Sequence, residues 1–195
     1  MPKTYTEEER KNIRLMLIEE AEKALFHGGV ESVSVDELVR RVSIPKGTFY
    51  LFFKSKEELF LSVLSSFRTE MNDKILALLQ ELDENHIVTS LTDVFMFLTW
   101  ELYSRGIFRI LDEHEEALIR KKTGLTVLSD EMDRLFSFLR EVFSYFAIDD
   151  ENDLDGFFTS YMLILYSLLH ADKIKDLRLA LRLSIRGLIL QLVGE

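Results

Sequence analysis

Two prolines, at positions 2 and 45, are the only ones in this chain of 195 residues. Proline removes a backbone donor and clashes with the preceding helical turn, so its scarcity permits helix nearly throughout. Apolar residues recur at intervals of three and four, as in Ile13, Leu17 and Ala21, and not at intervals of two. The sequence therefore predicts an all-α protein.

The composition indicates a globular protein with a substantial core and excludes several kinds of chemistry. Hydrophobic residues make up 47% and charged residues 30% of the chain, and there is no cysteine. Disulfides, thiolate zinc sites, iron–sulfur clusters and thiol nucleophiles are thereby excluded. The sequence also has no glycine-rich phosphate loop, nucleophile elbow or paired-histidine zinc motif. We expect neither an enzyme nor a bound metal or cofactor.

An acidic run at residues 112–116 contains His114 and resembles a metal site in composition. Adjacent helical residues diverge around the axis, so five in a row cannot converge on one ion, and we expect no metal there. The first fourteen residues are polar where a signal peptide needs an apolar core. The most apolar stretches are too short to span a bilayer. We expect a soluble cytoplasmic protein with no membrane partner.

Local signals place about nine helices along the chain. Three capping-box patterns, in which a Ser or Thr is followed three residues later by Glu, predict helix starts at Thr6, Ser34 and Ser55. Gly28 and Gly29 end the first helix, and the second stops before Pro45. A short third helix spans 46–53. The later helices are predicted near 87–104, 107–122, 126–147, 153–171 and 175–193.

The first 53 residues form a candidate three-helix head with a helix-turn-helix at 34–53. Apolar residues on the second helix meet Ile44, Phe49 and Phe53 on the third. At position 47 the missing glycine side chain lets the backbone approach another surface closely. The net charge of −10 is uneven, with about −1 in residues 1–60 and −9 beyond them, so the head is the part that phosphate would approach. The residues predicted to point outward from the third helix and just after it are Lys46, Thr48, Tyr50, Lys54 and Lys56.

Residues 46–60, Lys-Gly-Thr-Phe-Tyr-Leu-Phe-Phe-Lys-Ser-Lys-Glu-Glu-Leu-Phe, resemble the signature of the TetR family of transcriptional regulators. The first helix with its Gly29, and the run 34–38 after it, are similar to the family's opening as well. The resemblance covers about residues 10–62. Two positions depart from the family pattern, because Ser43 stands where the turn usually has glycine and Pro45 where Ser or Thr is usual.

The resemblance implies a sequence-specific DNA-binding regulator, expected to be a homodimeric repressor on a near-palindromic operator. The recognition helix, about 46–52, is expected in the major groove. Ser34 matches a position that touches the DNA backbone. Lys46, Thr48 and Tyr50 are expected to make phosphate and base contacts, and Lys56 a phosphate contact. We expect a DNA-binding domain at 1–53 and an effector-binding and dimerisation domain at 54–195.

The larger domain is rich in aromatic residues, which fit either a bundle core or a cavity for a small, largely apolar effector. Family members commonly bind an effector between the middle helices. We expect that binding of this effector releases the protein from DNA. The last two helices are apolar over a wide arc, which fits either a dimer interface or closure of the monomer core, and the dimer is favoured. The alternative function is a helical adaptor or ligand-binding protein without DNA binding. The predicted effector contacts are Phe97, Trp100, Tyr103, Phe108, Tyr161 and Tyr166.

Overall fold

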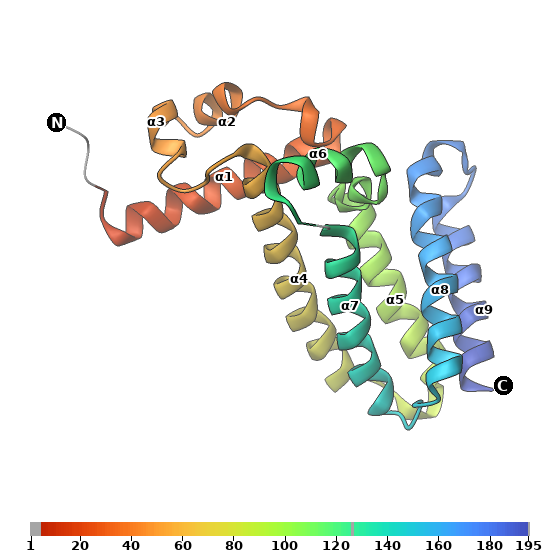
Figure 1. Cartoon of the computed structure of the whole chain (residues 1–195). Helices are drawn as coiled ribbons and strands as arrows, with labels where there is room; N and C mark the ends of the chain where they lie inside the picture. The colour runs from red at the N-terminus through yellow and green to blue at the C-terminus, as the bar shows by residue number, and fades with distance from the viewer. Residues whose placement is uncertain (1–4, 126, 195) are drawn as a thin grey trace. The chain divides into compact units, whose positions relative to one another are not determined.

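The computed structural model, which describes residues 5–125 and 127–194, is built from α-helices joined by short turns (Figure 1). The described residues contain no strand, and the all-α prediction is confirmed. None of their helices is long and apolar enough to cross a bilayer. The described residues form nine α-helices, which are α1 (Glu7–Gly28), α2 (Val35–Arg41), α3 (Lys46–Phe49), α4 (Lys56–Gln80), α5 (Ile87–Ser104), α6 (Glu113–Thr123), α7 (Val127–Ser144), α8 (Glu151–Ser167) and α9 (Leu177–Val193).

The predicted helix starts are at the predicted residues, although only one carries the full capping box. Thr6 accepts a hydrogen bond from the Glu9 backbone, and the Glu9 carboxylate accepts one from the Thr6 backbone. Ser34 caps α2 by accepting from the Glu37 backbone, but the Glu37 carboxylate pairs with Arg41 instead of answering Ser34. Each cap satisfies a backbone donor that a helix end leaves without a partner.

Two predicted helices are interrupted by tighter turns. The helix predicted at 107–122 is a 3₁₀ turn, Ile107–Leu111, followed by α6. Asp112 separates them because its carboxylate accepts from the backbones of His114 and Glu115 and so begins a new helix. The helix predicted at 153–171 ends at Ser167, and the chain continues as a 3₁₀ turn in which His170 has non-helical angles.

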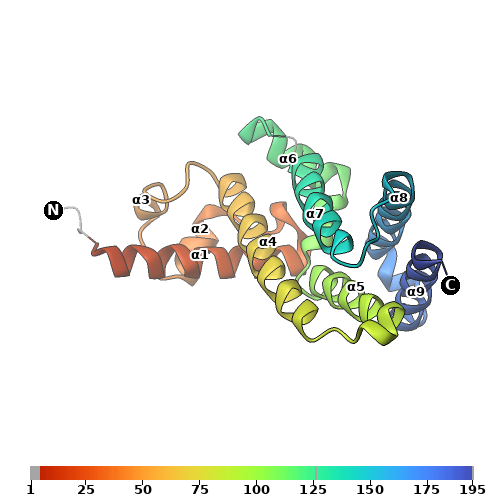
Figure 2. The same cartoon turned by 90° about the horizontal axis from the view of Figure 1, so that it is seen from below.

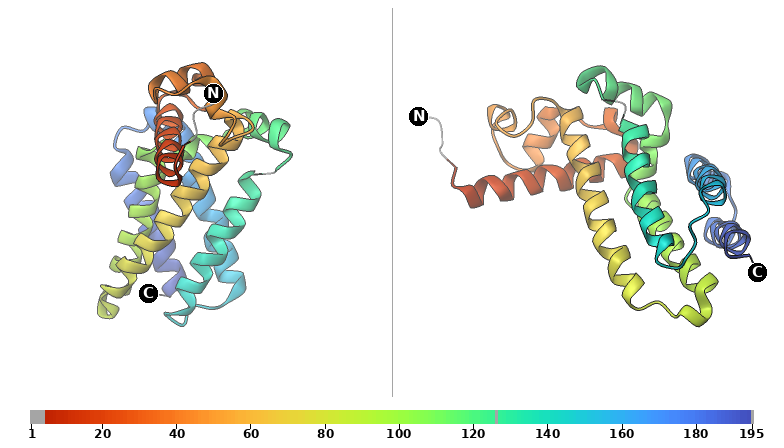
Figure 3. Two further views of the ribbon diagram at one scale, coloured as in Figure 1. Left: turned by 90° about the vertical axis from the view of Figure 1, so that its left-hand side faces the viewer. Right: turned by 60° about the horizontal axis from the view of Figure 1, so that its bottom comes forward.

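The chain divides into two compact units that do not follow one cut along the sequence. Unit 1 consists of Met1–Phe67 and Arg105–Val127, and unit 2 of Arg68–Ser104 and Leu128–Glu195. In unit 1, α1 packs against α2 and against the 3₁₀ turn that precedes α6, and α2 and α3 lie on the same side of α1 (Figure 3). The domain boundary predicted near residue 53 stays a prediction.

Unit 1 holds the segment from 105 onward by specific contacts with the end of α1. Arg105 makes a two-pronged ion pair with Glu22, with nitrogen–oxygen distances of 2.6 and 2.7 Å. Gly106 has φ +74°, and a Cβ there would lie 2.4 Å from the Cα of Phe26. The Glu115 carboxylate, from the acidic run, accepts a hydrogen bond of 2.6 Å from the Val30 backbone. The acidic run therefore has an architectural role in unit 1.

Unit 2 is a helical bundle in which α9 packs against both α5 and α8, and Figure 2 shows α8 and α9 side by side. Aromatic side chains from α5, α7 and α8 fill its core, with ring centroids between 5.0 and 6.1 Å apart. Such edge-on and stacked pairs add to the free energy gained by burial alone. The members of this cluster are Phe95, Phe143, Phe157 and Tyr161.

Candidate nucleic-acid interface

The segment from Ser34 to Phe53 forms a helix-turn-helix. Within the turn, the Ile44 backbone donates to the Val39 carbonyl at 2.9 Å. Pro45 has extended angles (φ −63°, ψ 146°) and precedes α3, whose first bond runs from the Thr48 backbone to the Pro45 carbonyl at 2.8 Å. The proline ring suits this place because its fixed φ matches and no donor is needed there.

Ser43 lies at the tightest point of this turn and has φ +56°. Left-handed backbone is costly for any residue with a Cβ, which explains why glycine is favoured at such a position. The side chain of Ser43 is exposed, so no neighbour adds to the backbone cost. Ser43 therefore adopts the left-handed turn conformation that glycine would adopt at this position.

The short α3 separates buried from exposed residues sharply. Phe49 and Phe53 are fully buried and hold α3 against the rest of unit 1. Tyr50 is 52% exposed and Leu51 is 58% exposed, which is uncommon for two large adjacent side chains. At Gly47 a Cβ would meet nothing within 4 Å, so the backbone there is open to an approaching surface.

Thr48 does not point outward as the sequence predicted. It is 7% exposed, and its hydroxyl lies 3.3 Å from the hydroxyl of Tyr5. Its side chain lies on the inner side of α3, next to the buried Phe49 and within reach of Tyr5. A role for Thr48 in DNA contact stays a prediction.

The cations predicted for phosphate contact differ in what holds them. The ammonium of Lys46 pairs with Asp36 at 2.9 Å, and this hydrogen bond raises the pKa of Lys46. The ammonium of Lys56 donates to the carbonyls of Val30 and Val33 at 2.9 and 3.1 Å, and so fixes the loop before α2. Lys54 is exposed.

Sequence reasoning missed two arginines on α1 that lie against this motif. The guanidinium of Arg10 lies 5.3 Å from the ring centroid of Phe52, and that of Arg14 lies 4.7 Å from the Phe53 ring. Arg14 also donates to the hydroxyl of Ser62 at 3.1 Å. Their spacing of four residues on α1 is a signal in the sequence, because it places both side chains on one helix face.

The residues predicted to line an effector cavity belong to α5, the 3₁₀ turn Ile107–Leu111 and α8. Trp100 and Tyr103 are brought together, with ring centroids 5.6 Å apart, and Arg178 lies over the Trp100 ring at 5.5 Å. Tyr161 is fully buried in the aromatic core of unit 2 and bonds to Thr99. These positions give the three aromatics different surroundings.

The other three predicted effector residues each have different neighbours. Phe97 is half-buried, with the Lys74 ammonium 5.8 Å from its ring centroid. Tyr166 is 41% exposed on α8. Phe108 belongs to unit 1, where Arg109 lies over its ring at 5.5 Å. An effector-binding role for these residues stays a prediction.

Comparison with known proteins agrees with the motif. Residues 17–63 match a family model described as bacterial regulatory proteins, tetR family. Two uncharacterized HTH-type transcriptional regulators of Bacillus subtilis (strain 168) are similar over the same region. YuxN is 39% identical over 61 residues, which are 31% of this chain and 21% of YuxN. YhgD is 34% identical over 59 residues, which are 30% of this chain and 31% of YhgD. The match therefore spans less than a third of either relative.

Solved structures extend the likeness to nearly the whole chain. The fatty acid degradation regulator FadR from Bacillus halodurans has a TM-score of 0.65 and 16% identity, over 96% of this chain and 97% of its own. A putative TetR-family regulator from Mesorhizobium loti has a TM-score of 0.68 and 15% identity, over 97% and 98%. FadR from Bacillus subtilis, solved in complex with stearoyl-CoA, has a TM-score of 0.62 and 16% identity, over 90% and 96%. Residues 17–63 of this chain thus match the tetR family model, and the chain as a whole shares the all-α fold of these solved regulators.

Proposed function

We propose that this chain is a sequence-specific DNA-binding transcription regulator. The observation that carries the proposal is the exposed pair Tyr50 and Leu51 directly after α3, near the open backbone of Gly47. A helix-turn-helix reads DNA by presenting its second helix to the major groove, where apolar and hydroxyl groups contact base edges. Lys46 and Lys54 flank this pair and supply charges for phosphate oxygens.

A homodimer is part of the proposal because one short recognition helix offers few contacts. The last two helices carry large exposed apolar residues, with Leu163 69%, Leu179 53% and Leu183 63% exposed. Arg182 of α9 pairs with Asp93 of α5 at 2.8 Å. The apolar side chains are thus left for a partner. Two heads would contact half-sites of a near-palindromic operator.

Regulation by a small, largely apolar ligand is the remaining part of the proposal, with release from the operator as its effect. Unit 1 contains the segment Arg105–Val127, which the chain joins to unit 2 at both ends. The ion pair of Arg105 with Glu22 and the bond of Glu115 to the Val30 backbone tie that segment to α1. A change in unit 2 therefore has a covalent route to the helix-turn-helix. A coupling of about 1–3 kcal/mol would weaken DNA binding roughly five- to 150-fold.

The test is fluorescence anisotropy with the DNA upstream of the chain's own gene, over a series of salt concentrations and with excess random duplex. Specific binding that weakens steeply as salt rises supports the proposal. The Tyr50→Ala variant should lose about 1–3 kcal/mol of specific binding. Tyr145→Ala is a matched control, because Tyr145 is 90% exposed but lies in unit 2, and it should bind normally.

Failure to bind any duplex, including those from a random-sequence selection, would reject the proposal and favour the helical adaptor, provided the protein is folded and dimeric. Effectors are tested in the same assay. Stearoyl-CoA is one arm, because the Bacillus subtilis FadR structure contains it. A ligand that binds unit 2 tightly but leaves operator affinity unchanged would reject the release mechanism alone.

A further inference from the structure

Unit 2 has a groove of about 430 Å³ between the last turns of α4 and the C-terminal half of α7. Its volume lies within the range of about 300–1,000 Å³ that is typical of small-molecule sites. Its walls are mainly apolar, and several of these side chains are open to solvent, with Leu76 48% and Tyr145 90% exposed. The apolar lining includes Leu76, Leu79, Phe138, Val142, Tyr145 and Phe146.

Among the described residues that line the groove, the polar groups are few and include no cation. Gln80 and Glu141 line it beside the phenol of Tyr145. Glu141 is exposed, and its carboxylate has no hydrogen-bond or ion-pair partner among the residues that the structure describes. One carboxylate beside three aromatic rings is the combination that attracts an organic cation, because the face of each ring is negative.

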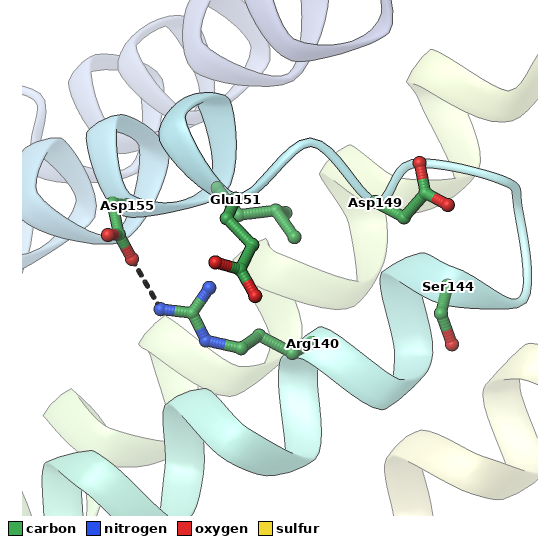
Figure 4. A pocket seen from close by; sticks show the side chains of 6 residues that line it. Arg140, Ser144, Asp149, Glu151 and Asp155 are labelled. Carbon is green, nitrogen blue, oxygen red and sulfur yellow. Dashed lines mark hydrogen bonds and ion pairs between the residues drawn. The ribbon is translucent and has the colours of Figure 1, made fainter.

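The cations on the two groove helices are already paired elsewhere. Arg140 immediately precedes Glu141 in sequence, and its guanidinium pairs with Asp155 (Figure 4). The same guanidinium lies 5.0 Å from the centroid of the Phe158 ring. Within unit 2, α4 and α7 carry four cations, and their carboxylate partners are Glu131 for Arg68 and Arg134, Glu70 for Lys74, and Asp155 for Arg140.

We propose that this groove binds a small organic cation with apolar or aromatic substituents. The apolar walls remove the substituents from water, and the rings with Glu141 hold the charge. An anionic head group would meet a carboxylate and no lining cation, so the groove disfavours ligands such as acyl-CoA. The proposal names the ligand chemistry for the regulator, and its regulatory meaning rests on the proposed function.

A second hollow in unit 2, beside Arg140, is less suited to such a ligand. Asp149, Glu151 and Asp155 surround it, but the Arg140 guanidinium already supplies the positive charge and Leu154 is its one apolar lining residue (Figure 4). An acidic cluster of this kind attracts any cation weakly and offers no shape complementarity to a particular ligand. It therefore serves as the internal control for attraction by charge alone.

The test is isothermal titration calorimetry of the purified full chain with tetraphenylphosphonium and with tetraphenylborate. These two ions have the same shape and differ in the sign of their charge. We expect tetraphenylphosphonium to bind about tenfold or more tightly than tetraphenylborate. Glu141→Gln should weaken its binding about two- to fivefold. Glu151→Gln, the matched control, should leave it unchanged. Leu76→Arg places a cation in the groove at an exposed position and should reverse the preference.

Equal affinities for the two ions would overturn the proposal. So would an equal loss in Glu141→Gln and Glu151→Gln, or normal tetraphenylphosphonium binding by Leu76→Arg when its thermal unfolding matches the wild type. These titrations contain no DNA, so their result is independent of operator binding. If tetraphenylphosphonium occupies the groove but does not release DNA, the site stands and the release mechanism fails.

Discussion

The buried hydrogen bond between Thr99 and Tyr161 gives a sharp prediction about the interior of unit 2. Both residues are fully buried, and their hydroxyl oxygens are 2.8 Å apart. The Thr99 hydroxyl donates to the Phe95 carbonyl at 2.7 Å, which uses its single proton. Tyr161 must therefore donate to Thr99. Burial raises the pKa of Tyr161, so the phenol keeps this proton throughout the neutral range.

The direction of this bond makes the two partners unequal. Tyr161→Phe removes a donor whose acceptor keeps its other bond, which should lower the free energy of unfolding by about 0.5–1.5 kcal/mol. Thr99→Val keeps the shape of the side chain but leaves the phenol buried with no acceptor. Its cost should be about 1–3 kcal/mol. The double variant should cost little more than Tyr161→Phe, because no stranded donor remains.

Urea denaturation followed by circular dichroism measures all three variants against the wild type. The expected order of stability is wild type, then Tyr161→Phe and the double variant, with Thr99→Val least stable. Tyr161 is also a predicted effector contact, and a solvated cavity at the phenol would let water replace Thr99. If Thr99→Val costs no more than Tyr161→Phe, the assignment of Tyr161 to a dry core is wrong.

Three further predictions concern unit 1. Ser43→Gly should raise the free energy of unfolding, measured in urea, by up to about 1 kcal/mol. Glycine removes the steric cost of left-handed backbone in the folded protein, and the greater conformational entropy of the unfolded chain offsets part of this gain. The Glu31 carboxylate accepts a hydrogen bond from the His114 ring and raises the pKa of His114, so this pair stabilises the protein below about pH 6.5 and the effect is lost as pH rises through the raised pKa. Glu31→Gln should therefore lower the Tm near pH 5.5 and leave it unchanged near pH 8.5. Asp36→Asn should free Lys46, tighten operator binding and steepen its salt dependence by about one counterion.

The helices and their starts could be predicted because their causes are local. The apolar spacing of α1 and the cap residues Thr6 and Ser34 act within a few positions, so the sequence displays them directly. The burial of Phe49 and Phe53 could be predicted equally well, because burying a large aromatic ring is strongly favourable. The helix-turn-helix followed from these short-range signals.

Contacts between side chains and residues far away in the sequence could not be predicted. Thr48 was predicted outward on a longer helix, but α3 stops after one turn and its hydroxyl reaches Tyr5, 43 positions away. Lys56 was assigned to phosphate, yet its ammonium is used by two carbonyls more than twenty positions earlier. No periodicity encodes these contacts, which depend on how distant segments pack. The assignment of Arg105–Val127 to unit 1 has the same origin.

The contacts of Lys56 also change how its role in DNA binding should be understood. Its ammonium joins the start of α4 to the loop between Val30 and Val33, which leads directly into the cap of α2 at Ser34. Those two carbonyls take two of the three N–H donors of the Lys56 ammonium, so one donor is left for a phosphate, in an orientation that the two bonds fix. Lys54 is exposed, so a phosphate could approach its ammonium from more directions. In the proposed complex with DNA, we therefore expect Lys56 to act chiefly by positioning α2 and Lys54 to supply charge.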